Sequence, residues 1–309
     1  MAIKNTILRR SFDSQFTPAA PGVAAQLRLK LKVMLMAVDP GGRTARDGYR
    51  YGSANFDESD KQTSDNIHAI RSWKKDEFRA FETDFKLAAE RGWNNQIILL
   101  PPDADAPAGL SDDDYRQLIL RPGLAAHVAC SLEIQIVRSG TGVVPRAIID
   151  VARLLFDDDD TARSHHFMIT NKDVKFSTNY FKDIAFKQVV AAHEVGHWLG
   201  PDAYDADGSF QHVDYAAARA RRLPVNADEE YGTTATRSMS IMGRGCVASE
   251  YDATPWLARI KEHTGIADGW RFIHRIRFNN GAAPVSARQA RLITGPQASR
   301  QPTAPRRFT

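Results

Sequence analysis

Residues 185 to 200, AFKQVVAAHEVGHWLG, constrain the fold of this chain more than any other segment. Read as a helix, the segment carries apolar side chains on nearly its whole circumference, and a helix of that kind lies inside a protein. It also carries Glu194, with a histidine on either side. A buried glutamate costs several kcal/mol unless it is paired or serves a chemical purpose. The sequence therefore predicts a large core built around a polar site.

The spacing of these polar residues suits a metal ion. At about 100° per residue, His193 and His197 lie about 40° apart on one face of a helix, so both imidazoles can reach one ion. Glu194 projects about 60° from His197, beside the ion and not onto it. A hydrolytic zinc site needs this set, because two neutral nitrogens bind the metal while a carboxylate takes a proton from the bound water. We therefore expect zinc, with both histidines as ligands and Glu194 as the general base; two hydrogen-bonded core histidines are the alternative.

A third zinc ligand is expected from the chain that follows this helix. Gly200 lets the chain leave the helix sharply, and Asp202 is the next side chain able to bind zinc. Asp205 needs a wider turn. His212 is chemically the better ligand, but it requires residues 202–211 to loop out. We expect Asp202 as the third ligand, keep His212 as the alternative, and place Asp205 behind both.

The remaining patterns predict a mixed α/β (α+β) domain. Residues 26–38, QLRLKLKVMLMAV, alternate in polarity as a half-buried strand does. Residues 64–92 place apolar side chains at three- and four-residue steps, which is typical of a long amphipathic helix, with Ser64 or Asp65 at its start and Gly92 at its end. Further strands are expected at residues 95–102 and 128–137, a pair of strands at 164–170 and 174–180, and a helix at 253–263.

Charge divides the chain into a body and a tail. No acidic residue follows Asp268, whereas eight of the 41 basic residues do, which leaves 33 basic against 37 acidic side chains in the body. A slightly acidic body argues against nucleic acid as its partner. We expect an N-terminal arm over residues 1–26, one domain over residues 27–280, and an Arg-rich, disordered tail over residues 281–309 that suits an acidic partner.

The sequence predicts neither a membrane span nor a secretory signal. No apolar run approaches the roughly 20 residues that cross a bilayer, and the opening residues have no continuous apolar region of the signal-peptide kind. We therefore expect a soluble protein that is cytoplasmic as synthesised or is exported by a non-Sec route. Cys130 and Cys246 are too few for a disulfide scaffold, and two unpaired thiols are expected.

A second motif follows the histidine segment. SMSIMGRG, residues 238–245, places Met242 in a turn of small residues. Together HEVGHWLG, residues 193–200, and SIMGRG resemble the metzincin superfamily of zinc endopeptidases, in which an HExxHxxGxxH/D segment is followed by a Met-turn beneath the metal. The resemblance covers about residues 27–265, although only these two motifs are specific. It implies a twisted mixed sheet, a long backing helix and an active-site helix, with Met242 as the hydrophobic floor of the site.

The resemblance also implies an activity. It makes His193 and His197 zinc ligands, and it makes Glu194 the general base and acid of a zinc-dependent endopeptidase that acts on polypeptides. Because no signal segment is recognisable, a bacterial effector or toxin is the expected context. The alternative is a non-catalytic, zinc-stabilised structural or interaction module, in which protein ligands fill every position of the metal.

The chain departs from the metzincin pattern at the third ligand. Ala203, which cannot bind a metal, stands three residues after Gly200. A likeness to bacterial sequences of the form HEFGHxLGxxDEY, with one residue deleted here, favours Asp202. The tyrosine that follows the Met-turn of some metzincins is absent, so Tyr231 and Tyr251 are only candidates for stabilising an oxyanion.

Overall fold

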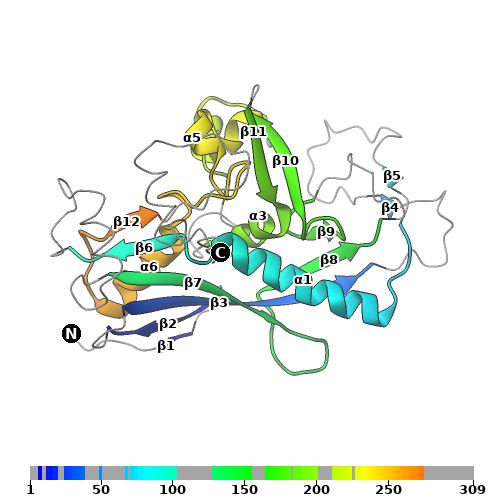
Figure 1. Cartoon of the computed structure of the whole chain (residues 1–309), viewed down its shortest axis with the longest axis horizontal. Helices are drawn as coiled ribbons and strands as arrows, with labels where there is room; N and C mark the ends of the chain where they lie inside the picture. Colours follow the sequence, from blue (N-terminus) through cyan, green and yellow to red (C-terminus); the bar gives the residue numbers. More distant parts are fainter. Residues whose placement is uncertain are drawn as a thin grey trace, which may run out of the picture.

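The structure is a computed structural model of the chain (Figure 1). It describes residues 6–8, 12–19, 24–38, 49–50, 67–68, 70–102, 127–154, 164–181, 184–200, 211–224 and 227–274. The expected tail, residues 281–309, lies outside the described residues, and so do Asp202 and Asp205.

The largest element of the fold is an eight-stranded mixed sheet. In spatial order its strands are β1 (Thr6–Ile7), β2 (Asp13–Thr17), β3 (Ala25–Ala37), β7 (Val128–Ile136), β6 (Ile97–Leu100) and β12 (Arg271–His274), with β8 (Ala147–Ala152) beside β3 and β9 (Met168–Thr170) beside β8. β3 runs parallel to β7 and β8, and β8 runs parallel to β9, whereas the other pairs of this sheet are antiparallel. The expected mixed α/β class is confirmed, and the strands predicted at residues 26–38, 95–102 and 128–137 are β3, β6 and β7.

β3 supplies the centre of the core because its side chains alternate between two faces. Leu27, Leu29 and Leu31 are fully buried. Arg28 lies on the opposite face and pairs with Glu133 of β7, with 3.0 Å between Nη1 and Oε2. The apolar face therefore turns toward the helices, and the charged face stays at the surface.

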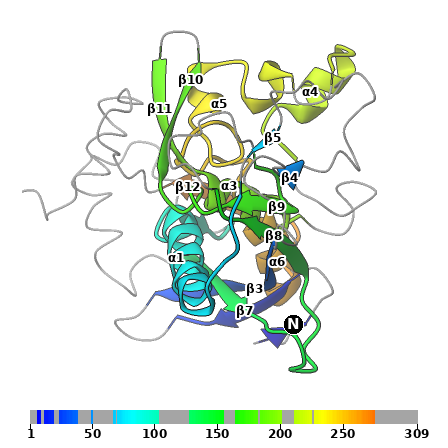
Figure 2. The ribbon, with the colours of Figure 1, turned by 90° about the vertical axis from the view of Figure 1, so that its right-hand side faces the viewer.

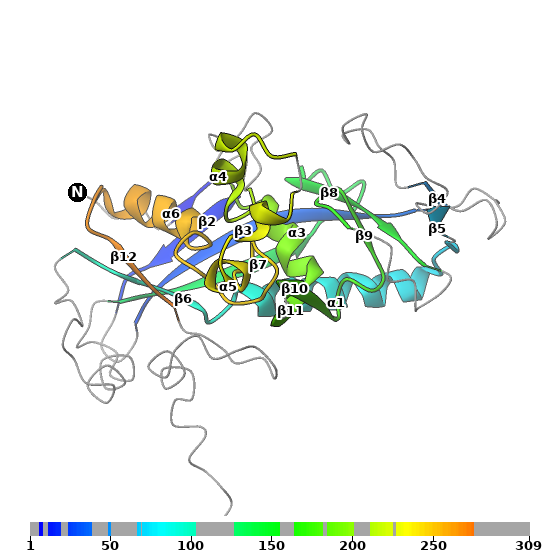
Figure 3. The same cartoon turned by 90° about the horizontal axis from the view of Figure 1, so that it is seen from above.

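A long helix, α1 (Lys75–Trp93), joins this sheet to the site helix, α3 (Val190–His197). α1 contacts both β7 and α3 (Figure 3). The indole Nε1 of Trp93 donates a hydrogen bond to the carbonyl of Ala192, at 2.9 Å. Gly92 approaches Ala192 so closely that a Cβ at Gly92 would overlap the Ala192 side chain. These contacts fix the position of α3 over the core.

α1 begins later than the sequence predicts. The expected start is Ser64 or Asp65, whereas the helix starts at Lys75. Ile70 instead forms an isolated bridge with Leu154, and β5 (Ile67–His68) pairs with β4 (Tyr49–Arg50). The predicted start is wrong because a short run with two β-branched isoleucines does not distinguish a helix from an extended segment that finds a pairing partner.

The chain reaches the site through a β-hairpin. β10 (Phe176–Phe181) and β11 (Ile184–Val189) pair antiparallel, and β11 runs straight into α3. Figure 2 shows this hairpin projecting from the body of the molecule. Two predictions are wrong here: β9 pairs with β8 and not with residues 174–180, and residues 185–189 are strand and not helix. Over so short an apolar run, aromatic and β-branched residues fit a strand as well as a helix.

Short helices follow the site helix. They are α4 (Tyr215–Ala220), the 3-10 helix η2 (Asp228–Tyr231), α5 (Ala235–Ser238) and α6 (Thr254–Thr264). α6 confirms the helix predicted at residues 253–263 and packs against β2 and β3. Within the described part of the chain, no helix is both long enough and apolar enough to span a bilayer. No disulfide joins Cys130 to Cys246, as expected.

The N-terminal stretch expected as an arm contributes two strands to the sheet. β1 and β2 lie within residues 1–26, and Phe12 and Phe16 are buried in the main core. Ser14 of β2 hydrogen-bonds to His263 of α6, with 2.9 Å between Oγ and Nε2. The described residues of this stretch are therefore packed on the domain that they precede.

Candidate metal centre

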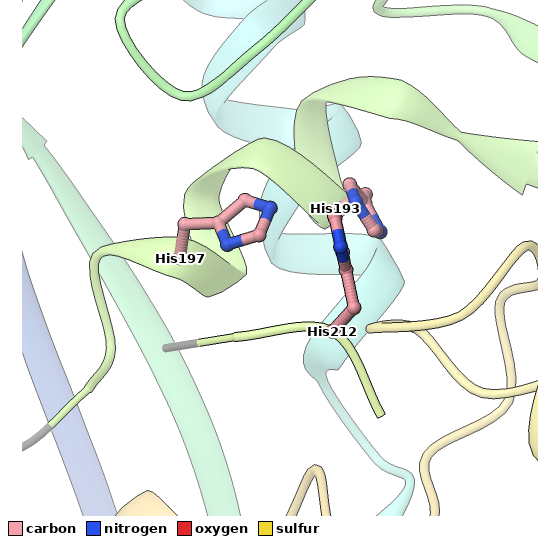
Figure 4. A group of neighbouring side chains, drawn as sticks. All are labelled: His193, His197 and His212. Carbon is pink, nitrogen blue, oxygen red and sulfur yellow. The ribbon is translucent and has the colours of Figure 1, made fainter. Parts of the chain in front are cut away.

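Three histidines come together at α3. His193 and His197 project from the helix toward His212, which lies on a separate segment just before α4 (Figure 4). The ring centroids of the three pairs are 5.1, 5.4 and 5.0 Å apart, and one ring nitrogen of each residue lies within 4.8 Å of the others. All three side chains are buried. Zinc ligands at about 2.0–2.1 Å stand about 3.3 Å apart, so small side-chain movements bring the three rings onto one ion.

The hydrogen bonds of two of these rings leave Nε2 free for a metal. Nδ1 of His193 donates to the carbonyl of Ile241 at 2.7 Å, because a carbonyl can only accept. Nδ1 of His212 lies 3.2 Å from Oε2 of Glu230. A carboxylate or carbonyl on the far nitrogen orients a ligating imidazole and raises its basicity. Both rings are therefore held in the tautomer and orientation that a zinc ligand needs.

Burial keeps these rings neutral. It lowers the pKa of His193 to about 3, and the nearby His212 adds to the effect. Burial also lowers the pKa of His212, although Glu230 acts in the opposite direction. Only the neutral imidazole binds a metal, so the site is ready for an ion at neutral pH without first releasing a proton.

Glu230 anchors the third histidine and was not predicted from the sequence. Its carboxylate is buried between His212 and Arg219, and Arg219 Nη2 bonds to Oε1. Its backbone carbonyl accepts from the N–H of Asp214, at 2.8 Å. The ring of Tyr231 packs on that of His212, with 3.9 Å between centroids. No periodic pattern in the sequence relates Glu230 to the histidines, because the contact depends on how the short helices fold back.

Glu194 lies beside the three histidines without bonding to His197. Its Oε2 is 4.0 Å from Nε2 of His197, and its side chain is buried. Burial raises the pKa of Glu194 well above its usual value, and the charge of Asp173 adds to the shift. Asp173 is itself buried and accepts hydrogen bonds from Ser164 and Thr170. A bound cation acts against this shift, since it favours the ionised carboxylate.

Residues 241–244 form a turn, here called the methionine turn, that connects both parts of the site. Met242 is fully buried against α3, where a Cβ at Gly196 would overlap its sulfur. The carbonyl of Ile241 accepts from His193, and the carbonyl of Met242 accepts from the N–H of Val213, at 3.1 Å. One turn therefore contacts both His193 on the helix and Val213, the residue that follows His212.

Asp252 holds the methionine turn. Its Oδ1 accepts from the N–H of Met242 at 3.0 Å, and its Oδ2 accepts from the N–H and the hydroxyl of Ser249, both at 2.6 Å. The carboxyl is fully buried, and this burial raises the pKa of Asp252 to about 6. The turn therefore depends on a buried acid that no sequence motif singled out.

His166 is a further residue that the sequence did not predict. A ring nitrogen of His166, a carboxylate oxygen of Glu194 and a ring nitrogen of His197 lie within 4.8 Å of one another. His166 precedes β9, and its carbonyl accepts from the indole Nε1 of Trp198 at 2.8 Å. No spacing rule relates His166 to the helix histidines, and its neighbour His165 belongs to neither histidine group.

The remaining candidates from the sequence are two aspartates, proposed as zinc ligands, and two tyrosines, proposed to stabilise an oxyanion. Asp202 and Asp205 fall outside the described residues, so their distances to the histidines are not given by the structure. Tyr251 donates its hydroxyl hydrogen to the carbonyl of Gln211, at 3.0 Å, and Tyr231 packs on His212. Neither geometry assigns an oxyanion role. A comparison of the chain with protein-family models, curated proteins and solved structures finds no match.

Proposed function

We propose that this protein is a zinc-dependent endopeptidase. The observation that carries the proposal is a buried Glu194 beside three buried imidazoles, of which His193 and His212 have a pKa lowered by burial. Its carboxylate is too far from His197 for a hydrogen bond, at 4.0 Å, yet near enough to accept a proton from a water between them. The resemblance of HEVGHWLG and SIMGRG to the metzincin motifs supports a polypeptide as the substrate.

Each residue has a defined task in this proposal. Zinc, when bound, supplies a Lewis acid that polarises the scissile carbonyl and lowers the pKa of water toward neutrality. Glu194 accepts the proton of the attacking water and passes it to the leaving amine. The histidines fix the position of that water relative to Glu194. The methionine turn packs against their helix and accepts a hydrogen bond from His193.

We propose His212 as the third zinc ligand. Its ring is within reach of both helix histidines, and Glu230 fixes its Nδ1 as a second-layer carboxylate commonly does for a zinc ligand. This changes the preference drawn from the sequence, which placed Asp202 first. The loop that His212 needs is residues 202–211, nearly all of which lie outside the described part of the chain.

The non-catalytic alternative makes a different demand on the site. A structural zinc site is closed by four protein ligands, whereas a catalytic site keeps one position for water or substrate. Among the described residues, the group around His212 offers three ligands, and Glu194 stands beside them at a distance that leaves room for water. This favours the catalytic proposal.

The experiment that tests the proposal measures metal content and cleavage together. We expect the purified protein to hold stoichiometric zinc and to cleave an unfolded protein substrate, and we expect a chelator to abolish cleavage until zinc is restored. Stoichiometric zinc with no cleavage of any unfolded polypeptide supports the structural module instead. Cleavage that survives complete removal of zinc contradicts the metal mechanism.

A further inference from the structure

The metal centre contains two overlapping groups of ligands. His193, His197 and His212 form the first group, and His166, Glu194 and His197 form the second. In each group the three ligand atoms lie within 4.8 Å of one another. His197 belongs to both groups, so the second group lies directly beside the first and not elsewhere on the protein.

The second group is held by contacts of its own. The indole of Trp198, the residue after His197, donates to the carbonyl of His166 at 2.8 Å. The ring centroids of His166 and His197 are 5.2 Å apart, and the ring of His166 also packs against Phe167, at 4.0 Å between centroids. His166 is half-buried, whereas Glu194 and His197 are buried. The position of His166 beside the site helix is therefore built into the fold.

The chemistry of the second group also suits a transition metal. Two imidazole nitrogens and one carboxylate oxygen are all ordinary ligands of zinc. The group differs from the first in one respect, because its third member is the carboxylate that the proposed reaction needs as a base. A metal ion that binds Glu194 removes that base from the reaction.

We propose that the centre has a second, inhibitory metal position, formed by His166 and Glu194 next to His197, which is filled when zinc exceeds one equivalent. Because the first ion already binds His197, His166 and Glu194 are the two protein ligands that the second ion does not share with the first. Fewer ligands bind it, so its affinity is lower than that of the first ion. The same centre thus binds one ion for activity and a second ion that stops it.

Zinc binding alone tests this inference. Metal-free protein is dialysed against buffers of increasing free zinc, and bound zinc per chain is measured at each concentration. We expect a tight equivalent followed by a weaker one. His166→Gln should lose only the weaker equivalent, and Glu194→Gln should lose it as well, since a neutral amide is a poor zinc ligand. His165→Gln is the matched control and should keep both, because His165 is in neither group.

Activity supplies a second measurement, which rests on the proposed function. For each variant the quantity compared is the ratio of its rate in excess zinc to its own rate at one equivalent. For the unchanged protein we expect this ratio to be about one hundredth or less, as loss of a general base predicts. The ratio should be equally small for His165→Gln and near one for His166→Gln.

The outcomes separate the two proposals. A single zinc equivalent in the unchanged protein, or a weaker equivalent that survives His166→Gln, overturns the second position whether or not the protein is a peptidase. Two equivalents with the expected dependence on His166, but no cleavage under any condition, support the second position and contradict the proposed function. Absence of any tight equivalent contradicts both.

Discussion

The two sides of the candidate metal centre are held in place by different means. His193 and His197 stand on α3, so the helix backbone sets their spacing and the packing of α1 sets the position of the helix. His212 stands outside any helix and is fixed by Glu230 and by the methionine turn. One side of the site is therefore made by local structure, and the other by contacts between distant segments.

This difference predicts how each side responds to change. Each side also has its own buried glutamate: Glu194 is the proposed general base, and Glu230 contacts His212, the proposed third ligand. Substitution of the first should affect chemistry with little effect on metal, and substitution of the second should affect metal with less effect on chemistry.

The largest effect is expected for Glu194→Gln. The amide has nearly the same shape and can hold a water molecule, but it cannot accept the proton. The rate of peptide cleavage should fall roughly 10² to 10⁴-fold, the usual cost of losing a general base, while the first zinc equivalent is retained. Steady-state cleavage and metal analysis measure the two quantities. Glu133→Gln on the far face of the sheet is the control, and activity of Glu194→Gln within a few-fold of that control would falsify the role of Glu194.

The next largest effect is expected from the titration of Asp252, whose carboxyl group holds the methionine turn that contacts both sides of the site. Because its folded pKa is raised to about 6 from a usual 3.8, the folded state holds the proton more tightly than the unfolded state. Its contribution to stability is complete below about pH 4 and is lost as the pH rises through 6, a change of about 3 kcal/mol.

Urea unfolding of the metal-free protein between pH 4 and 7 checks this sign. The free energy of unfolding should decline with rising pH more steeply for the unchanged protein than for Asp252→Asn, which has no carboxyl to titrate. Parallel curves for the two proteins would mean that Asp252 is ionised in the folded protein throughout this range.

Glu230→Gln tests the side of the site that depends on distant contacts. The amide keeps an acceptor for His212 but loses the charge that pairs with Arg219 and raises the basicity of the ring. We expect zinc affinity to fall about 10–100-fold, as for other second-layer partners of zinc ligands. With saturating zinc, the cleavage rate should recover most of its value. Competition with a chelator of known affinity measures the loss, and unchanged affinity would show that the contact of Glu230 with His212 contributes nothing to binding.

The same division explains what the sequence could predict. The strand β3 and the pair His193 and His197 follow from periodicities of two and about four residues, which are set by the local backbone. Burial of the helix was also inferred correctly, since every residue from 191 to 197 is buried. The start of α3 was not, because the apolar run of β11 fits either a strand or a helix.

The partners of the ligands could not be predicted, because no spacing rule links residues that meet only after folding. Glu230 lies 18 residues beyond His212, and His166 lies 28 residues before Glu194. Glu230 reaches His212 only because η2 folds back against it, and His166 is held beside the site helix by the hydrogen bond from Trp198 to its carbonyl. His212, the alternative third ligand drawn from the sequence, is the residue that the structure brings next to His193 and His197.

The smallest effect on the cleavage rate is expected for Tyr251→Phe. This substitution tests whether a tyrosine near His212 has a structural or a catalytic role. The Tyr251 hydroxyl donates to the carbonyl of Gln211, the residue before His212, and this bond leaves its hydrogen directed at the backbone. Loss of one such bond should lower the free energy of unfolding by about 1 kcal/mol. The cleavage rate at saturating zinc should change by less than about threefold, whereas loss of an oxyanion donor costs about 10²-fold or more. Urea unfolding and steady-state cleavage of the same preparation measure both quantities. A large loss of rate with unchanged stability would mean that Tyr251 turns toward the substrate during the reaction, and the loop-borne side of the site would then take part in the chemistry as well as in metal binding.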